Sequence, residues 1–266
     1  MKRKHDDEIL SYIRAKYSEI GINNQSICCR PSSPLSCCGV DNTLDDVSNL
    51  VGYSPEELSS APEDANLGLG CGNPQAIADI KPGECVLDLG CGGGLDTFLA
   101  ARKVGDKGLV IGVDMTLDMI NRARVNAKKG NFNNVDFRLG EIEKLPVNSE
   151  TMDVIISNCV INLSLKKQRV FNEAFRVLKS GGRLAISDVV AIENLPEEVK
   201  NDADAYAGCV SGAISIKDLE KMLAMAGFVK IVITITKNSN EIVGEWMPDY
   251  PVSKYIASAI IQAKKP

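Results

Sequence analysis

Cysteine is the residue type best able to carry chemistry in this chain, because nine cysteines stand against a single histidine. That histidine, His5, lies in a charged N-terminal run, so the remainder of the chain has no imidazole to act as a base or a metal ligand. Five cysteines stand alone in the sequence: Cys71, Cys85, Cys91, Cys159 and Cys209. If the protein does chemistry near neutral pH, we expect thiols to be its agents.

The composition excludes several classes of partner. Hydrophobic residues make up 44% of the 266 residues and charged residues 24%, as in a globular protein with a substantial core. The net charge of −5 offers no basic surface for nucleic acid or an anionic membrane. No apolar stretch approaches the roughly 20 residues of a membrane span, and the N-terminus lacks the apolar region of a signal peptide. We expect a cytoplasmic monomer with reduced thiols.

The elements that must position the thiols alternate from residue 83 onward. Short apolar segments are followed by amphipathic helical ones, which is typical of a doubly wound, mostly parallel sheet in an α/β fold. The expected strands are 85–89, 109–113, 135–139, 152–157 and 183–188. The expected helices are 96–104, 117–129, 170–178 and 216–226. Two last strands, 229–236 and 255–263, are expected to pair antiparallel as a reversed C-terminal hairpin.

Three regions are expected along the chain. They are an N-terminal helix and Cys-rich loop extension at 1–74, a ligand-binding domain at 75–226 with a substrate-site insertion at about 189–215, and C-terminal strands with a small C-terminal region at 227–266. Helical spacing over 4–20 places Ile9, Ile13, Tyr17 and Ile20 on one face, and Gly21 is expected to end this helix. The sequence leaves open whether the helix covers the ligand or is only a docked terminus.

Loops are expected at 22–45, which holds both cysteine doublets, and at 66–75, which is too rich in glycine for a helix or strand and contains Cys71. Ser54 is expected to cap a further helix, because proline and two glutamates follow it. Trp246, between the last two strands, is expected to pack locally rather than bind a ligand.

A glycine-rich turn follows the first strand and marks a ligand site. Its glycines, Gly90, Gly92 and Gly94, have the spacing G-x-G-x-G, with Asp88 two residues upstream. Such a turn lets the backbone approach a bound ligand closely. The spacing differs from the G-x-G-x-x-G of dinucleotide-binding folds. Asp88 is expected either to contact the ligand or only to cap the turn.

Two further segments point to a nucleoside ligand. Asp114 ends the second strand, where a carboxylate can accept hydrogen bonds from both ribose hydroxyls, and Met115 follows it. Glu141 and Ile142 follow the third strand, where a side chain and backbone amides can bind an adenine edge. Asn158, at the end of the fourth strand, completes the expected cofactor-binding set.

Together these motifs resemble the class I S-adenosylmethionine (SAM) methyltransferases, including their reversed C-terminal hairpin. The resemblance covers roughly residues 75–265 and implies SAM as the cofactor, with 75–226 as the SAM-binding methyltransferase domain. An NAD-binding protein would need a phosphate-binding turn of different spacing.

Three single cysteines are expected at the substrate site. Open α/β sheets bind ligands beyond the carboxyl ends of their strands. Cys159 follows the fourth strand, Cys209 lies in the insertion after the fifth, and Cys71 lies in the loop before the domain. Converging thiols would suit a thiophilic centre rather than magnesium or calcium.

Three segments carry a second resemblance, to a more specific family. Asn66–Pro74, Ile155–Leu163 and Tyr206–Ala213 are similar to segments of the arsenite methyltransferase family. The resemblance implies that Cys71, Cys159 and Cys209 bind trivalent arsenic and that the substrate is arsenite or its thiol conjugates. The arsenic lone pair would attack the SAM methyl group, so no general base is needed.

The resemblance also implies redox partners. Each methyl transfer makes arsenic pentavalent, so a thiol reductant such as thioredoxin or glutathione must restore the trivalent state. A fourth, N-terminal family cysteine can form a disulfide with the first during turnover, and Cys37 or Cys38 would be its match.

Several interpretations stay open. Cys85 and Cys91 are expected to be structural. The doublets Cys28-Cys29 and Cys37-Cys38 can relay arsenic, bind zinc or take no part. The alternative enzyme is a SAM-dependent C-methyltransferase of a small organic acceptor such as a quinone, and the alternative outside catalysis is an arsenic-binding protein.

Overall fold

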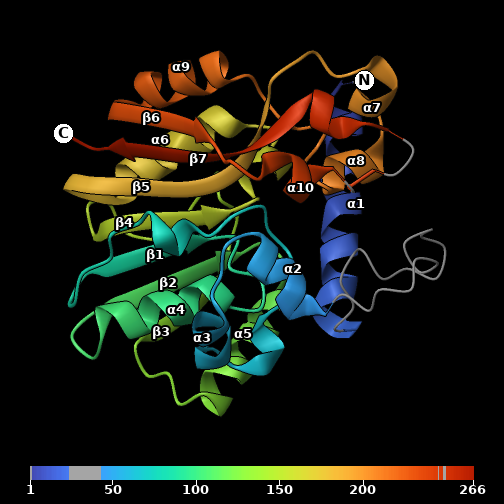
Figure 1. Ribbon diagram of the computed structural model, residues 1–266. Coiled ribbons are helices and arrows are strands. Elements are labelled where there is room, and N and C mark those ends of the chain that lie inside the picture. Colours follow the sequence, from blue (N-terminus) through green and yellow to red (C-terminus); the bar gives the residue numbers. More distant parts are fainter. Residues whose placement is uncertain (1, 24–42, 245, 248–249) are drawn as a thin grey trace.

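A single twisted sheet of seven strands organises the molecule (Figure 1). The computed structural model describes residues 2–23, 43–244, 246–247 and 250–266. The strand order is β3-β2-β1-β4-β5-β7-β6, in which β7 runs antiparallel to both neighbours and the first five strands are parallel. The strands are β1 Cys85–Leu89, β2 Leu109–Asp114, β3 Val135–Leu139, β4 Met152–Asn158, β5 Leu178–Ala191, β6 Val229–Ile235 and β7 Ile256–Lys264. This confirms the doubly wound α/β fold with its reversed hairpin.

Helices cover both faces of the sheet, which explains why most residues of the central strands are apolar and buried. The helices are α1 Lys2–Asn23, α2 Leu44–Leu50, α3 Pro55–Ser60, α4 Leu95–Val104, α5 Leu117–Lys129, α6 Lys167–Val177, α7 Glu197–Lys200, α8 Ala203–Ala207, α9 Ile216–Ala226 and α10 Ser239–Val243. In β1, Val86 packs toward α4, while Leu87 and Leu89 pack in the cluster formed with α6 and α9. All three side chains are fully buried, as expected for a strand with both faces covered.

The fifth strand is longer than the sequence predicts. The prediction of 183–188 was too short, because β5 runs from Leu178 to Ala191. Its start pairs with Met152 of β4, and its end continues to pair with β7, from Val189 opposite Ser258 to Ala191 opposite Ile256. Helix α6 accordingly ends at Val177 instead of 178, and the insertion that carries α7 and α8 begins after β5. The partners of the extended C-terminal end come from β7, which lies far away in sequence.

The N-terminal helix docks on the body through the predicted apolar face. Ile13 and Ile20 are buried, and Ile9 and Tyr17 are partly buried against the same clusters. The helix does not end at Gly21 but continues to Asn23. It packs against α5 and α8, and in Figure 1 it lies beyond the carboxyl ends of the parallel strands. No described helix is long and apolar enough to cross a membrane.

The segment between α1 and β1 agrees with most of its predictions. Ser54 caps α3 as predicted and forms a capping box with Glu57, and the loop at 66–75 contains only a 3₁₀ turn that begins at Pro74. The predicted loop at 22–45 ends earlier, because Thr43 and Asp46 form a second capping box that starts α2 at Leu44. The division into regions at residues 74 and 226 stays a prediction.

Docking of α1 into the core can be tested at two isoleucines of that helix. Ile13 is 0% exposed and Ile22 is 67% exposed. We expect Ile13→Ala to lower the free energy of unfolding, or of α1 docking, by about 2–5 kcal/mol, because it leaves a cavity. The matched Ile22→Ala should change it by less than about 0.5 kcal/mol. Urea unfolding and hydrogen exchange of the α1 amides measure both quantities, and equal effects of the two variants would contradict the docked arrangement.

Candidate functional site

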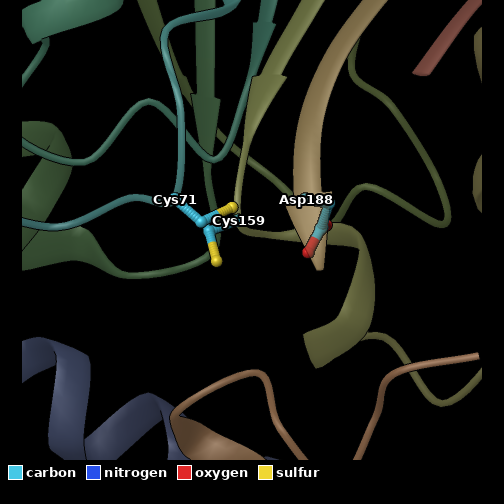
Figure 2. Close-up of side chains that lie close together, drawn as sticks. All are labelled: Cys71, Cys159 and Asp188. Carbon is cyan, nitrogen blue, oxygen red and sulfur yellow. The ribbon is translucent and has the colours of Figure 1, made fainter. Parts of the chain in front are cut away.

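Two of the predicted cysteines meet at the carboxyl edge of the sheet, beside a carboxylate. The thiol sulfurs of Cys71 and Cys159 and a carboxylate oxygen of Asp188 all lie within 4.8 Å of one another. Figure 2 shows the three side chains, which come from the glycine-rich loop at 66–75, the end of β4 and the end of β5. These segments are distant in sequence, so only the sheet topology brings them together.

Cys209 joins the same cluster from the insertion after β5. Its thiol donates to the carbonyl oxygen of Cys159 at 2.9 Å. Cys71 and Cys209 are buried and Cys159 is half-buried, and all three contact one apolar cluster that also contains Ile13 and Val189. The three predicted thiols therefore converge, although they come from three separate segments.

Two of the three cysteines have a strained backbone. Cys159 has a φ angle of 57° and Cys209 one of 64°, in the left-handed region that residues with a side chain rarely adopt. The amide of Cys159 donates to Ser187 O at 2.8 Å, and that of Cys209 donates to Tyr206 O at 3.0 Å. Such strain costs about 1–3 kcal/mol per residue and persists where the surrounding structure holds it, often at functional sites.

The loop of Cys71 is held by the side chain of Asn158. The Asn158 amide nitrogen donates to Gly72 O at 2.7 Å, and its oxygen accepts from the Cys71 amide at 3.0 Å. A Cβ on Gly70 would lie 2.7 Å from that same nitrogen, so glycine is required there. Ser258 on β7 also donates to Cys71 O, at 2.6 Å. The structure thus shows that Asn158 holds the loop of Cys71. Its predicted contact with the cofactor stays a prediction.

Burial keeps the thiols protonated at neutral pH. It raises the pKa of Cys71 above its usual value. For Cys209, the hydrogen bond with Cys159 and then burial raise the pKa well above the usual value. The pKa of Cys159 is also raised well above the usual value, since its contact with Cys71 and its burial outweigh the lowering effect of Cys209. A buried site of neutral thiols favours an uncharged thiophilic substrate over a small hydrated ion.

Asp188 is the site residue that the sequence analysis missed. It accepts hydrogen bonds from the amides of Ile161 and Val189 and from the Asn162 side chain, at 2.8–2.9 Å. Burial raises its pKa to about 6, although these hydrogen-bond donors and the nearby positive charge of Lys167 act to lower the pKa. The available signal was its position at the carboxyl end of an apolar strand, the same criterion that selected Asp114.

The glycine turn and Asp114 form a second, adjoining half of the site. Gly92 N donates to the Asp114 carboxylate at 3.0 Å, and Thr116 donates to its other oxygen through its amide and hydroxyl. A Cβ on Gly90 would lie 2.3 Å from Val160, the residue after Cys159, and Gly90 also has a φ angle of +71°. The turn thus packs directly on the segment that carries a site thiol. A carboxylate beside a glycine turn fits a ribose-bearing ligand, as in nucleoside-binding α/β proteins.

The other predicted cofactor residues have mixed surroundings. Asp88 is buried and accepts a hydrogen bond from the Thr97 hydroxyl at 2.7 Å, which ties β1 to α4. Met115 is half-buried against the thiol cluster, Ile142 is buried, and Glu141 pairs with Arg14 of α1. Their contacts with a cofactor stay predictions, as does the function of Gly94, where α4 begins.

A buried polar network joins the two halves of the site. Tyr53 donates to both carboxylate oxygens of Asp96, at 2.8 and 2.9 Å, and accepts from Asn158 at 2.9 Å. Burial raises the pKa of Asp96 to about 6. Because Asp96 lies in the first turn of α4, the network links the helix after the glycine turn to the loop of Cys71. The sequence offered no periodic signal for this contact between distant side chains.

The other cysteines singled out in the sequence lie apart from the three site thiols or outside the described residues, and the tryptophan packs against an apolar cluster. Cys91 packs with Phe98 and Phe137, and the half-buried Cys85 packs at the start of β1, so neither belongs to the thiol cluster. Trp246 is partly buried against the apolar cluster that also contains Ile242, Val243 and Val252, in agreement with the predicted packing role. The doublets Cys28-Cys29 and Cys37-Cys38 and the side chain of His5 lie outside the described residues.

Comparisons with known proteins show the family of the chain. A family model described as a methyltransferase domain matches residues 80–227. The arsenite methyltransferase of Halobacterium salinarum is 46% identical over 264 residues, which are 98% of this chain and 67% of that protein. The arsenite methyltransferase of Homo sapiens is 44% identical over 80 residues, 30% of this chain and 21% of that protein. The chain therefore spans about two thirds of the first relative's length.

Solved structures give the same result at the level of the fold. The arsenic(III) S-adenosylmethionine methyltransferase of Chlamydomonas reinhardtii superposes with a TM-score of 0.59 at 31% identity, over 83% of this chain and 73% of that chain. A phosphoethanolamine N-methyltransferase of Haemonchus contortus superposes with a TM-score of 0.62 at 18% identity, over 86% of this chain and 61% of that chain. The second similarity concerns the fold alone.

The raised thiol pKa values can be tested by alkylation. Only the thiolate reacts with iodoacetamide, so a raised pKa moves the rise in rate to higher pH. We expect labelling of Cys71, Cys159 and Cys209 to be slow at pH 7 and still to accelerate above about pH 9, beyond the midpoint of free glutathione. Mass spectrometry of the three peptides follows each rate. A rate that levels off near neutral pH would show thiolates in the resting site and contradict this electrostatic account.

Proposed function

Since this chain belongs to the arsenite methyltransferase family, within the class I SAM-dependent methyltransferases, we propose that it methylates trivalent arsenic held by Cys71, Cys159 and Cys209. The observation that carries the proposal is the convergence of three thiols against the glycine turn. A methyl donor bound at that turn would lie beside a thiophilic substrate. The substrate is arsenite, or arsenite delivered as a thiol conjugate.

The protonated thiols suit the binding step. Arsenite exchanges its three hydroxyl groups for three thiols, and each thiol proton leaves with a hydroxyl group as water. A thiol conjugate exchanges in the same way and releases its free thiol. Since the raised pKa values keep the thiols protonated, the site supplies these protons itself. The bound complex is uncharged and suits a buried apolar site.

The half of the site formed by the glycine turn and Asp114, the cofactor half, would hold SAM through the residues already described. The turn from Gly90 to Gly94 would approach it closely, Asp114 would accept from its ribose, and Glu141 and Ile142 would contact its adenine. When bound, SAM supplies an electrophilic methyl group. The thiols hold arsenic with its lone pair free, so no side chain has to remove a proton. The reaction therefore needs no imidazole base, in contrast to methylation at oxygen or nitrogen.

Turnover requires a reductant. Transfer of a methyl cation to the lone pair raises arsenic from the trivalent to the pentavalent state. Two thiols that join in a disulfide supply the two electrons that restore it. We propose thioredoxin or glutathione as the external source, with Cys37 or Cys38 as a possible internal partner of Cys71. The proposal also includes a monomer in the reducing cytoplasm.

Replacement of single cysteines tests the thiol site. We expect Cys159→Ser to lower arsenite methylation by about 100-fold or more, because arsenic loses a ligand and its alignment with the methyl group. Cys85→Ser is the matched control and should leave the rate unchanged. Arsenic speciation by liquid chromatography with elemental mass spectrometry measures the products, with SAM, arsenite and a thiol reductant present.

Binding is measured separately through the single tryptophan. Trp246 packs against the large apolar cluster to which Cys71 and Cys209 belong. We expect its fluorescence to change when arsenite binds, and Cys159→Ser to weaken that response while SAM still binds. Undiminished arsenite methylation by Cys159→Ser would disprove the thiol site. Binding of arsenite without methyl transfer would identify an arsenic-binding protein, and methylation of a quinone in place of arsenite would identify a C-methyltransferase.

A further inference from the structure

Tyr17 of α1 contacts both halves of the site. Its side chain packs against the apolar cluster that contains Cys71 and Cys209. It also packs against a second cluster, formed by Ile20, Leu67 and Met119, on the cofactor side. Leu67 belongs to the loop of Cys71, and Met119 belongs to α5, which begins just after Asp114. The ring of Tyr17 therefore lies where the apolar cluster of the thiols meets the packing around α5.

Hydrogen bonds to the insertion after β5 fix the position of Tyr17 beside the three site cysteines. Its hydroxyl donates to Ala207 O at 3.1 Å, two residues before Cys209. One and five residues away on the same helix, Lys16 and Tyr12 both donate to Asp204 at 2.6 Å. These contacts hold α1 against α8.

Residues of the cofactor half also contact helix α1. Arg14 forms an ion pair with Glu141, and the Ser18 hydroxyl donates to Asp118 in the first turn of α5. Glu141 and the segment that starts α5 flank the place where the cofactor's nucleoside is expected. Helix α1 thus contacts both halves of the site, and the residues that make these contacts, from Tyr12 to Ser18, include Tyr17.

The electrostatic surroundings of Tyr17 agree with this position. Burial, then the charges that Cys209, Cys159, Asp114 and Asp188 would carry, raise the pKa of its hydroxyl well above the usual value. Groups from both halves are therefore close enough to act on one side chain. The phenol stays neutral, so its ring offers an electron-rich face rather than a charge.

We propose that Tyr17 is a positioning residue whose ring faces the sulfonium of bound SAM and keeps the methyl group directed at the thiols. An aromatic face attracts a cation but gains nothing from a neutral thioether. The ring would therefore favour SAM over S-adenosylhomocysteine, the uncharged product, and would aid product release. This inference rests on the proposed function for the identity of the cofactor.

The ratio of two dissociation constants tests the proposal. Calorimetry measures Kd for SAM and for S-adenosylhomocysteine, without arsenite, in the unchanged protein and in Tyr17→Leu. We expect Tyr17→Leu to weaken SAM roughly threefold to thirtyfold more than S-adenosylhomocysteine, which is the range of a cation–aromatic contact. Tyr17→Phe retains the ring and should restore the original ratio, although it loses the contact with Ala207.

Tyr12→Leu is the matched control, because Tyr12 lies on the same helix, is 37% exposed and also donates to the insertion. It should leave the ratio unchanged. An equal loss of affinity for both ligands in Tyr17→Leu, or an unchanged ratio, would overturn the proposal and leave α1 as a cover only. Because arsenite is absent, a protein that binds SAM but fails to methylate arsenite would disprove the proposed function while the ratio still decides on Tyr17.

Discussion

The site depends on one side chain amide, that of Asn158, which fastens the loop of Cys71 to the end of β4. Its oxygen accepts from the Cys71 amide and its nitrogen donates to Gly72 O. The next residue along the chain is Cys159, so the same short segment positions one thiol directly and another through hydrogen bonds. Tyr53 and Asp96 extend this network to α4, which follows the glycine turn. One network of buried hydrogen bonds therefore connects the segments that carry the thiols with the helix that follows the glycine turn. A buried polar network holds a single arrangement when its polar groups have hydrogen-bond partners.

Burial determines how this site can react. It keeps the thiols protonated and raises the pKa of Asp188 to about 6, close to the thiol sulfurs. A charged ligand would pay a large desolvation cost there, whereas an uncharged arsenic complex would not. The strained backbone at Cys159 and Cys209 places both side chains into the same small space, and the strain is offset by the packing of the surrounding elements.

Much of the fold was predictable because its signals are local. Hydrophobic periodicity located the strands and the flanking helices to within a few residues, and Ser54 marked a helix start through its own capping box. The errors have different causes. Helix α2 begins inside a predicted loop because Thr43 and Asp46 form a capping box that was overlooked. Strand β5 is longer because Leu178 pairs with Met152 of β4 and because Val189 to Ala191 pair with β7, some 65 residues further along the chain. A partner so distant in sequence leaves no periodic trace near the strand it extends.

The sequence by itself determined which residue types are available for chemistry: nine cysteines against one histidine, a glycine turn followed by an acid at the end of the next strand, and the family segments around Cys71, Cys159 and Cys209. These are properties of residue type and spacing along the chain. Only the tertiary structure decided that the thiols meet, that Asp188 stands beside them and that Tyr17 contacts both halves of the site. Each of these facts depends on packing between segments remote in sequence, and burial, which alters the pKa values, exists only once that packing has formed.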